Sequence, residues 1–256
     1  MEDIMLIYNN CSEIGIKNRT ITEGREIQLV REYIDYRKEQ FKATDDKKMA
    51  IFVEPQVGNS YPDIVFVEYN PENYQTWNQY RNMLEKKELK ILYHIYSVNG
   101  IDLEGIVSQL GVTWKDAGLS VEKLYDSGLV IRKSGRWVLS DANNIITNNI
   151  QAVEAKIDKW DEVLQQSIIN KNFASECYAL MDSKNRPKRE VLSKFGRFGV
   201  GLYFKDGNKF ETLKRAKSTN IPLSFNSILF NEWIGRIVYK GDELINVNGV
   251  VPSSQS

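Results

Sequence analysis

Residues 150–157, Ile-Gln-Ala-Val-Glu-Ala-Lys-Ile, are the stretch that decides how this chain folds. Their apolar character predicts a buried strand. Because successive strand residues face opposite sides of a sheet, Glu154 and Lys156 share one side, and the residues between and beside them pack on the other. An acid and a cation therefore lie side by side within an otherwise apolar strand.

A second apolar strand, expected at 63–69, begins with Pro62-Asp63. Where two carboxylates such as Asp63 and Glu154 converge on one point, they can hold a Mg²⁺ that keeps several water ligands. A metal so placed activates water and offsets negative charge on a scissile phosphate. A neighbouring lysine, here Lys156, then orients or deprotonates the nucleophile.

The motif of an acid, any residue and a lysine is weak by itself, because it recurs in this chain. It recurs at Asp45/Lys47, Asp46/Lys48, Glu85/Lys87, Glu88/Lys90 and Asp182/Lys184. Most of these pairs lie in a polar turn or at a helix start, where solvated charge pairs are common. Asp182 follows a strand and is the one serious rival, whereas Glu154 is embedded in a strand and followed by an amphipathic helix.

The two motifs lie 91 positions apart, from Asp63 to Glu154. Between them, apolar periodicity predicts helices at 83–98, 102–110 and 114–127. Asp102 and Thr113 suit the N-cap positions of the last two helices. A hairpin is expected next, with strands at 129–132 and 136–139. These features predict a helical module at 83–140 that interrupts the rest of the fold.

The segments on either side of this module alternate strands and helices. Residues up to about 18 are expected to be irregular. The expected elements are a helix at 22–41 with Thr22 as N-cap, strands at 49–54, 63–69, 150–157, 176–181 and 199–204, and helices at 159–175 and 187–195. This order is typical of the α/β class. The expected domains are 1–82, the first part of a core; 83–140, the inserted module; 141–243, the second part of the core; and 244–256, a flexible tail.

Composition excludes several classes of protein and site. The chain of 256 residues has two cysteines and one histidine, His94, which cannot supply a disulfide framework or an ordinary Cys/His zinc site. No apolar run is long enough for a membrane span, and the start, Met1-Glu2-Asp3, lacks the positive charge of a signal peptide. We therefore expect a cytoplasmic protein with no membrane partner, in which any hydrolysis depends on carboxylates, lysine and a metal.

Charge is balanced overall, with 34 basic and 34 acidic residues, but it is unevenly distributed. Residues 184–217 contain eleven Lys/Arg and three Asp/Glu. Such a local excess can bind a phosphate backbone, and it is equally typical of a solvated surface. The sequence leaves both interpretations open.

The motifs together carry a family resemblance. Pro62-Asp63 before an apolar strand, Glu154-Ala155-Lys156, and then Trp160 and Gln166 on the following helix resemble the PD-(D/E)xK, or restriction endonuclease-like, nucleases. The later strand around Gly199-Val200-Gly201-Leu202 is similar to one in that family. The resemblance covers about residues 20–70 and 145–205 and implies a mixed central sheet flanked by helices. The segment 83–140 resembles a winged helix-turn-helix domain.

The nuclease resemblance implies roles for individual residues. Asp63 and Glu154 would bind Mg²⁺ (or Mn²⁺) together with the backbone carbonyl of Ala155. Lys156 would serve the nucleophilic water, and Gln166 would face the site. A glutamate on the first helix completes many such sites; Glu26 is the choice here, with Glu23 as the alternative. Glu54, on the strand expected beside Asp63, is either a further site acid or an edge residue.

The winged-helix resemblance implies DNA contacts. Trp114 and Lys115 would enter a major groove, and the cations of the hairpin, Arg132, Lys133 and Arg136, would touch phosphates or the minor groove. From the basic segment, Lys188 and Arg189 are further DNA-binding candidates. However, residues 85–136 hold eight basic and seven acidic residues, so a protein-contact role is the alternative for this module.

These features predict a metal-dependent DNA endonuclease, a hydrolase of phosphodiester bonds. The alternative is a non-catalytic DNA-binding regulator that uses the nuclease-like core as a scaffold, and an RNA-directed or structure-specific nuclease is a third hypothesis. Double-strand cleavage generally requires two active sites, which favours a homodimer. No segment of the sequence identifies its interface.

Overall fold

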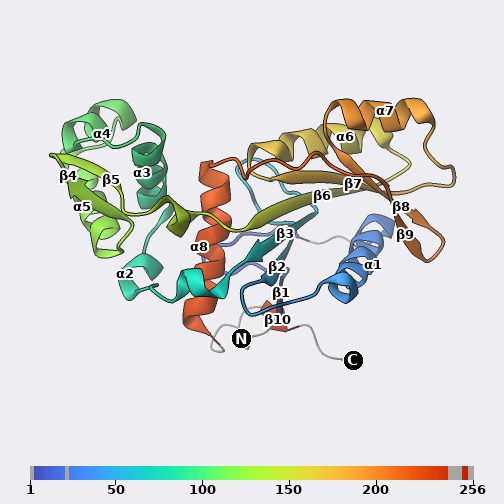
Figure 1. The fold of residues 1–256 in the computed structure, drawn as a ribbon, viewed down its shortest axis with the longest axis horizontal. Coiled ribbons are helices and arrows are strands. Elements are labelled where there is room, and N and C mark those ends of the chain that lie inside the picture. The colour runs from blue at the N-terminus through green and yellow to red at the C-terminus, as the bar shows by residue number, and fades with distance from the viewer. Residues whose placement is uncertain (1–2, 21–22, 242–249, 253–256) are drawn as a thin grey trace.

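A mixed central sheet organises the computed structural model, which describes residues 3–20, 23–241 and 250–252. Within these residues eight strands follow the order β10-β1-β2-β3-β6-β7-β8-β9 (Figure 1). The strands are β1 (Ile4–Ile7), β2 (Lys48–Val53), β3 (Ile64–Tyr69), β6 (Asn149–Ile157), β7 (Glu176–Asp182), β8 (Gly201–Asp206), β9 (Lys209–Lys214) and β10 (Val250–Pro252). The pairs β1–β2, β6–β7 and β7–β8 are parallel, and the other neighbours are antiparallel. The expected α/β class is therefore confirmed.

Helices cover both faces of this sheet because each buried strand is apolar on both sides. The helices of the core are α1 (Arg25–Gln40), α6 (Trp160–Ile169), α7 (Arg189–Arg197) and α8 (Phe225–Lys240). On one face, Val153 and Ala155 of β6 belong to the same apolar cluster as the buried side of α1. On the other face, Ala152 packs with α8, and Ala179 of β7 packs with α6. None of the described helices is long and apolar enough to cross a membrane.

The segment between β3 and β6 forms a separate group of elements. Its elements are η1 (Pro71–Tyr74), α2 (Gln79–Asn82), α3 (Lys86–Ser97), α4 (Leu103–Leu110), α5 (Trp114–Asp126), β4 (Val130–Lys133), β5 (Arg136–Leu139) and η2 (Ala142–Ile145). Asp102 and Thr113 are the N-caps of α4 and α5, where their side chains accept from Gly105 N and Asp116 N at 2.8 and 3.0 Å. Ile101 forms an isolated antiparallel bridge with Trp137 beside the two-stranded β4–β5 hairpin.

Helix α8 stands between the sheet and this helical module, α2 to β5 (Figure 1). Arg81 of the module donates to both oxygens of Glu232 on α8, at 2.6 and 3.3 Å, and the two side chains are only 4% and 0% exposed. Arg81 also donates to the Asn144 carbonyl at 2.7 Å. One helical turn further along α8, Arg236 donates to the carbonyls of Ile14 and Leu84. Buried polar contacts therefore fasten the module to the core.

Several expectations about the core need correction. The region expected to be irregular contains β1, which is too short to show a period and gains its stability from a parallel partner, β2. The helix expected at 159–175 ends at Ile169, where the asparagine-rich turn η3 (Asn170–Asn172) begins. Strand β9 and helix α8 were not expected.

Two further expectations concern residues next to parts of the chain that the structure does not describe. The first helix begins at Arg25 with Gly24 as its N-cap; Thr22 lies outside the described residues. The expected flexible tail at 244–256 contains β10, which pairs antiparallel with β1. The other residues of 244–256 lie outside the described part of the chain, so only β10 differs from the expected flexible tail.

The Arg81–Glu232 pair generates a prediction about stability. Removing one partner leaves an unpaired charge in a buried position, so Arg81→Met and Glu232→Leu should each lower the free energy of unfolding by about 3–5 kcal/mol. The double variant should lose less than the two losses combined, because it leaves no orphaned charge. Urea denaturation measures all three. As a control, Lys87→Met removes the exposed Lys87–Asp116 pair and should cost no more than about 1 kcal/mol.

Candidate active site

The register of β3 and β6 brings the two distant motifs together. Ile64, the first residue of β3, lies opposite Val153. Because the strands run antiparallel, the next residues outward are Asp63 and Glu154, which therefore face each other across the end of the ladder. Strand β6 continues to Ile157 beyond the last β3 partner. The site forms where β3 has ended and β6 has not.

Asp63 takes the place that a β3 backbone carbonyl would otherwise fill. Its Oδ2 atom accepts a hydrogen bond from the Ala155 backbone N–H at 2.6 Å. The N–H and C=O of one strand residue point toward the same neighbouring strand. The Ala155 carbonyl is thus on the Asp63 side of β6, where the sequence-based hypothesis needs it.

Glu154 is buried, with only 4% of its surface exposed. Its Oε1 atom accepts from Nδ2 of Asn170 at 2.7 Å, and Asn170 is itself 1% exposed. The Oδ1 atom of Asn170 is buried and has no hydrogen-bond partner. Sequence reasoning missed Asn170, although its position one helical turn after Gln166 was a usable signal.

The ion pair of Lys156 distinguishes between Glu26 and Glu23, the two candidate site residues of the first helix. Its Nζ atom lies 3.1 Å from Oε2 of Glu26. Glu23 instead pairs with Arg31, at 2.7 and 3.0 Å, away from Lys156. Of the two candidates, Glu26 is the one that reaches the site.

A small pocket of about 140 Å³ opens over these residues. Its charged and polar lining consists of Arg19, Thr20, Glu26, Glu54, Asp63 and Lys156. Glu54 thus lies at the site, with Oε2 4.0 Å from Nε of Arg19 and its backbone N–H donating to the Asp63 carbonyl at 3.0 Å. Glu54 has a positive φ of 47°, a backbone conformation that is uncommon for a residue with a side chain.

Burial and the closeness of the acidic side chains raise the pKa values of Asp63, Glu154 and Glu54. Burial raises the pKa of Asp63, and the hydrogen bond from Ala155 and the charge of Lys156 oppose that rise. Burial and the nearby Asp63 carboxylate raise the pKa of Glu154 well above its usual range. Burial and Asp63 also raise the pKa of Glu54. The site therefore concentrates negative charge that is only partly compensated.

The cation of the site remains protonated. Burial by itself would lower the pKa of Lys156, but the charges of Asp63, Glu26 and Glu154 outweigh burial and raise it. An ammonium group held at this point can donate hydrogen bonds to water or to an anionic group, and it offsets charge on either. Direct deprotonation of water by Lys156 is correspondingly disfavoured in the metal-free protein.

Gln166 and Asp182, two further candidates from the sequence, form no contact with Asp63, Glu154 or Lys156 among the hydrogen bonds and ion pairs of the described residues. Gln166 has a buried Oε1 atom without a hydrogen-bond partner, and none of the hydrogen bonds among described residues joins it to Asp63, Glu154 or Lys156. Asp182, the rival motif, lies 3.5 Å from Arg25 as a partly exposed ion pair. Its lysine, Lys184, is exposed beyond the end of β7. The rival therefore lacks the buried, paired arrangement of Glu154 and Lys156.

The donor atoms suit a hard divalent cation. Two facing carboxylates and a backbone carbonyl are oxygen ligands of the kind that Mg²⁺ and Mn²⁺ accept, with water completing the shell. Burial raises the pKa of both carboxyl groups, so a proton or a cation between them would stabilise the pair. Among the described residues, no group of three or more His, Cys, Asp or Glu side chains is arranged to hold a metal. Water and the Ala155 carbonyl would therefore supply the rest.

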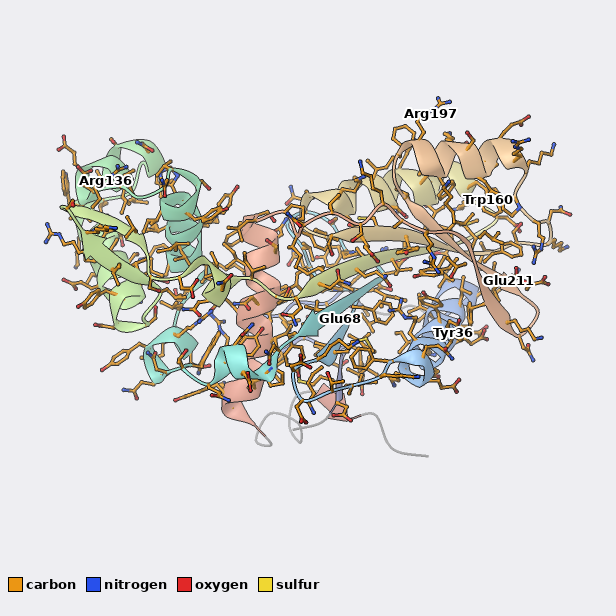
Figure 2. The ribbon with its side chains drawn as sticks, in the orientation of Figure 1. Tyr36, Glu68, Arg136, Trp160, Arg197 and Glu211 are labelled. Carbon is orange, nitrogen blue, oxygen red and sulfur yellow. The ribbon has the colours of Figure 1, made fainter. Side chains whose placement is uncertain are left out.

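The candidate DNA-binding residues are exposed but widely separated. Arg136 lies on the helical module and Arg197 on α7, with α8 between these two parts of the molecule (Figure 2). Trp114 and Lys115 are exposed at the start of α5, as are Arg132, Lys133 and Arg136 on the hairpin. Lys188 and Arg189 are exposed at the start of α7.

Part of the basic excess of residues 184–217 is neutralised. Arg186 pairs with Asp206 and Glu211 at 3.3 and 2.6 Å. Lys194 and Lys205 pair with acids from outside the segment, Asp161 and Glu32. The exposed cations that remain are concentrated at the two ends of α7 and on β9.

Comparison with family models, with curated proteins and with solved structures gives no match for this chain. The interpretation of the site therefore depends on its geometry and chemistry. That geometry joins an aspartate from one stretch of sequence with a buried glutamate and a lysine from another, at the end of a single strand pair.

The raised pKa values generate a prediction about pH. Because folding raises the pKa of Glu154, its contribution to stability is fully present below the unfolded pKa and is lost as pH rises through the folded pKa. In EDTA, the wild-type chain should thus lose stability through this group as the pH rises above about 4.5, the usual pKa of a glutamate. Glu154→Gln should remove that loss and melt higher than the wild type at pH 8.

Thermal unfolding at a series of pH values measures this difference. Added Mg²⁺ should raise the melting temperature of the wild type at pH 8 and leave that of Glu154→Gln nearly unchanged. The exposed Glu162→Gln variant, on the helix after β6, is the matched control and should follow the wild type in both measurements. A Glu154→Gln variant that melts lower than the wild type at pH 8 would contradict the electrostatic account.

Proposed function

We propose that this protein is a metal-dependent DNA endonuclease of the PD-(D/E)xK type. The observation that carries the proposal is the convergence of Asp63, Glu154 and Lys156 where β3 ends beside β6. The sequence predicts all three as site residues, and their proximity supports the roles proposed for them. Asp63 and Lys156 also line a pocket whose other charged residues are Arg19, Glu26 and Glu54.

Each residue of the site has a distinct proposed role in phosphodiester hydrolysis. Asp63 and Glu154 would hold a divalent metal, which when bound would supply activation of water and compensation of phosphate charge. Asn170 donates to one oxygen of Glu154 and so orients its carboxylate toward Asp63. Lys156, oriented by Glu26, donates to the attacking water or to the phosphate. Arg19, exposed at the pocket, is placed to pair with a backbone phosphate.

The helical module supports a role in orienting DNA. The order of α3, the Ile101 bridge, α4, α5 and the β4–β5 hairpin is that of a winged helix-turn-helix domain. The hairpin presents Arg132, Lys133 and Arg136 to solvent. These cations suit phosphate or minor-groove contacts, and the cations of α7 suit contacts nearer the nuclease core.

A scaffold role without catalysis is the alternative, and the electrostatics of the site disfavour it. A structural core gains nothing from two facing acids whose charged forms are disfavoured by burial. Such an arrangement persists where a bound cation or substrate makes use of it. The raised pKa values of Asp63 and Glu154 therefore favour the catalytic hypothesis.

Cleavage of supercoiled plasmid tests the proposal. Purified protein with Mg²⁺ or Mn²⁺ should convert the plasmid to nicked or linear forms, and EDTA should stop the reaction. Asp63→Asn and Lys156→Ala should each lower the rate by about 100-fold or more, because each removes charge stabilisation or metal binding at the reacting phosphate. DNA binding, measured by fluorescence anisotropy at constant salt, should survive in both variants.

Lys159→Ala is the matched control, since Lys159 is an exposed lysine just after β6 that pairs with Glu162. It should leave the cleavage rate within about twofold of the wild type. A panel of supercoiled, linear, branched and single-stranded DNA, and RNA, covers structure-specific enzymes. Binding without cleavage on every substrate would favour the regulator instead.

A further inference from the structure

In the part of the chain that the structure describes, lysines from separate segments surround the turn between α7 and β8. They are Lys171 of η3, Lys214 at the end of β9 and Lys217 in the segment that follows β9. Helix α7 ends at Arg197 (Figure 2), and residues 198–200 lead into β8. We call Lys171, Arg197, Lys214 and Lys217 the α7-end cluster.

Gly199 lets two of these lysines approach the backbone of the turn closely. Nζ of Lys171 donates to the Phe198 carbonyl at 2.8 Å and lies 3.1 Å from the place that a Cβ atom of residue 199 would take. The Cβ atom of Lys217 lies 3.2 Å from the same place. Gly199 also has a φ of 67°, a conformation that favours glycine. A larger residue would therefore push both lysines away from the turn.

Gly196 does the same for Lys214, three residues earlier. Nζ of Lys214 lies 2.8 Å from the place that a Cβ atom of residue 196 would take. The Gly199 N–H donates to the Gly196 carbonyl at 3.1 Å, so the two glycines are adjacent in space. The side chains of Lys171, Lys214 and Lys217 therefore converge on one stretch of backbone.

The α7-end cluster has no acidic partner among the described residues. None of its cations forms an ion pair of the kind that neutralises Arg186 and Lys194 nearby. A helix C-terminus attracts cations, but its partial charge is only about half of one elementary charge. Several like charges gathered at one helix end repel one another unless an anion lies between them. Because Arg197, Lys214 and Lys217 are exposed, an anionic partner can reach them.

The cluster borders the candidate active site. Asn170, which donates to Glu154, is the residue immediately before Lys171. Consecutive Cα atoms are about 3.8 Å apart, so the backbone that positions Glu154 also positions the first lysine of the cluster. A DNA strand carries one negative charge for about every 3.4 Å of helix axis. One strand can therefore meet the site and the cluster at the same time.

The same surface continues toward the helical module. Asn172, at the end of η3, accepts from Asn226 in the first turn of α8 at 3.4 Å. Beside Asn226, the centre of the Phe225 ring lies 6.0 Å from Nζ of the exposed Lys90 on α3. The start of α8 thus lies between the cluster and a cation of the module. A polymer with regularly spaced negative charges fits this row of cations, whereas a small anion would use only one end of it.

We propose that the α7-end cluster binds the phosphate backbone of the DNA substrate beside the cleavage site and directs the strand across the start of α8 toward the module. The identity of the substrate rests on the proposed nuclease function. The sequence selected Lys188 and Arg189, which lie at the opposite end of α7. Lysine side chains contact phosphates as point charges and carry no information about base sequence. The cluster therefore supplies affinity that is independent of the DNA sequence.

The salt dependence of DNA binding tests this assignment. Binding of the full chain to a fluorescent duplex is measured by anisotropy in EDTA, which prevents cleavage, at several salt concentrations. Lys214→Gln and Lys217→Gln should each weaken binding at least about fivefold at low salt and reduce the slope of log K against log[salt] by about 1, because each removes one phosphate contact. Lys214→Arg and Lys217→Arg keep the charge and should keep the wild-type slope.

Lys209→Gln is the matched control, since Lys209 is an exposed lysine at the other end of β9, about 17 Å from Lys214 at the usual rise per residue. It should leave the affinity and the slope unchanged. Glutamine variants of the cluster that melt like the wild type and bind with the wild-type slope overturn the proposal. An equal loss in Lys209→Gln does so too, because it indicates a diffuse attraction only. Binding that depends on the cluster in a chain that cuts no nucleic acid would instead refute the nuclease and leave this surface assigned.

Discussion

The antiparallel pairing of β3 with β6 is the interaction on which the rest of this structure depends. It joins the part of the chain before the helical module to the part after it and places both in one sheet. The module leaves β3 and returns to β6 at the same end of this pair, where Asn148 donates to the Glu68 carbonyl at 2.9 Å. Topologically, the whole module is the connection of a β-hairpin. The site lies at the other end of the same two strands.

A second constraint is the buried polar junction between the module and α8. Arg81 and Arg236 are two largely buried cations that share the neighbourhood of one buried carboxylate, Glu232. Backbone carbonyls from Ile14, Leu84 and Asn144 accept hydrogen bonds from the two guanidinium groups. Such contacts are directional, so they define one orientation of the module where apolar packing would accept several. The module is thereby held against α8 in one orientation.

The sequence was most informative where the signal was local. Helices α4 and α5 have their expected N-caps, Asp102 and Thr113, because capping depends on residues only three positions apart. Glu154 and Lys156 were recognisable because strand alternation is also local. By contrast, β1 and β10 depend on partners far away in sequence, and the contact of Asn170 with Glu154 depends on where α6 ends against the sheet. No sequence pattern distinguished Glu26 from Glu23, since that choice is made by the packing of α1.

The number of residues in β3 and β6 also determines which face of the sheet Glu154 occupies, because strand residues alternate between the two faces. From the rung of Glu68 and Asn149 to the expected rung of Asp63 and Glu154 is five residues, or about 17 Å at the usual rise per residue. A gain or loss of one residue within these strands would turn Glu154 toward the α1 side and empty the site, even if the sheet survived. The same change within the long connection would leave that face unchanged. The length of the connection can therefore change without altering which side of the sheet Glu154 faces, whereas the number of residues within β3 and β6 cannot.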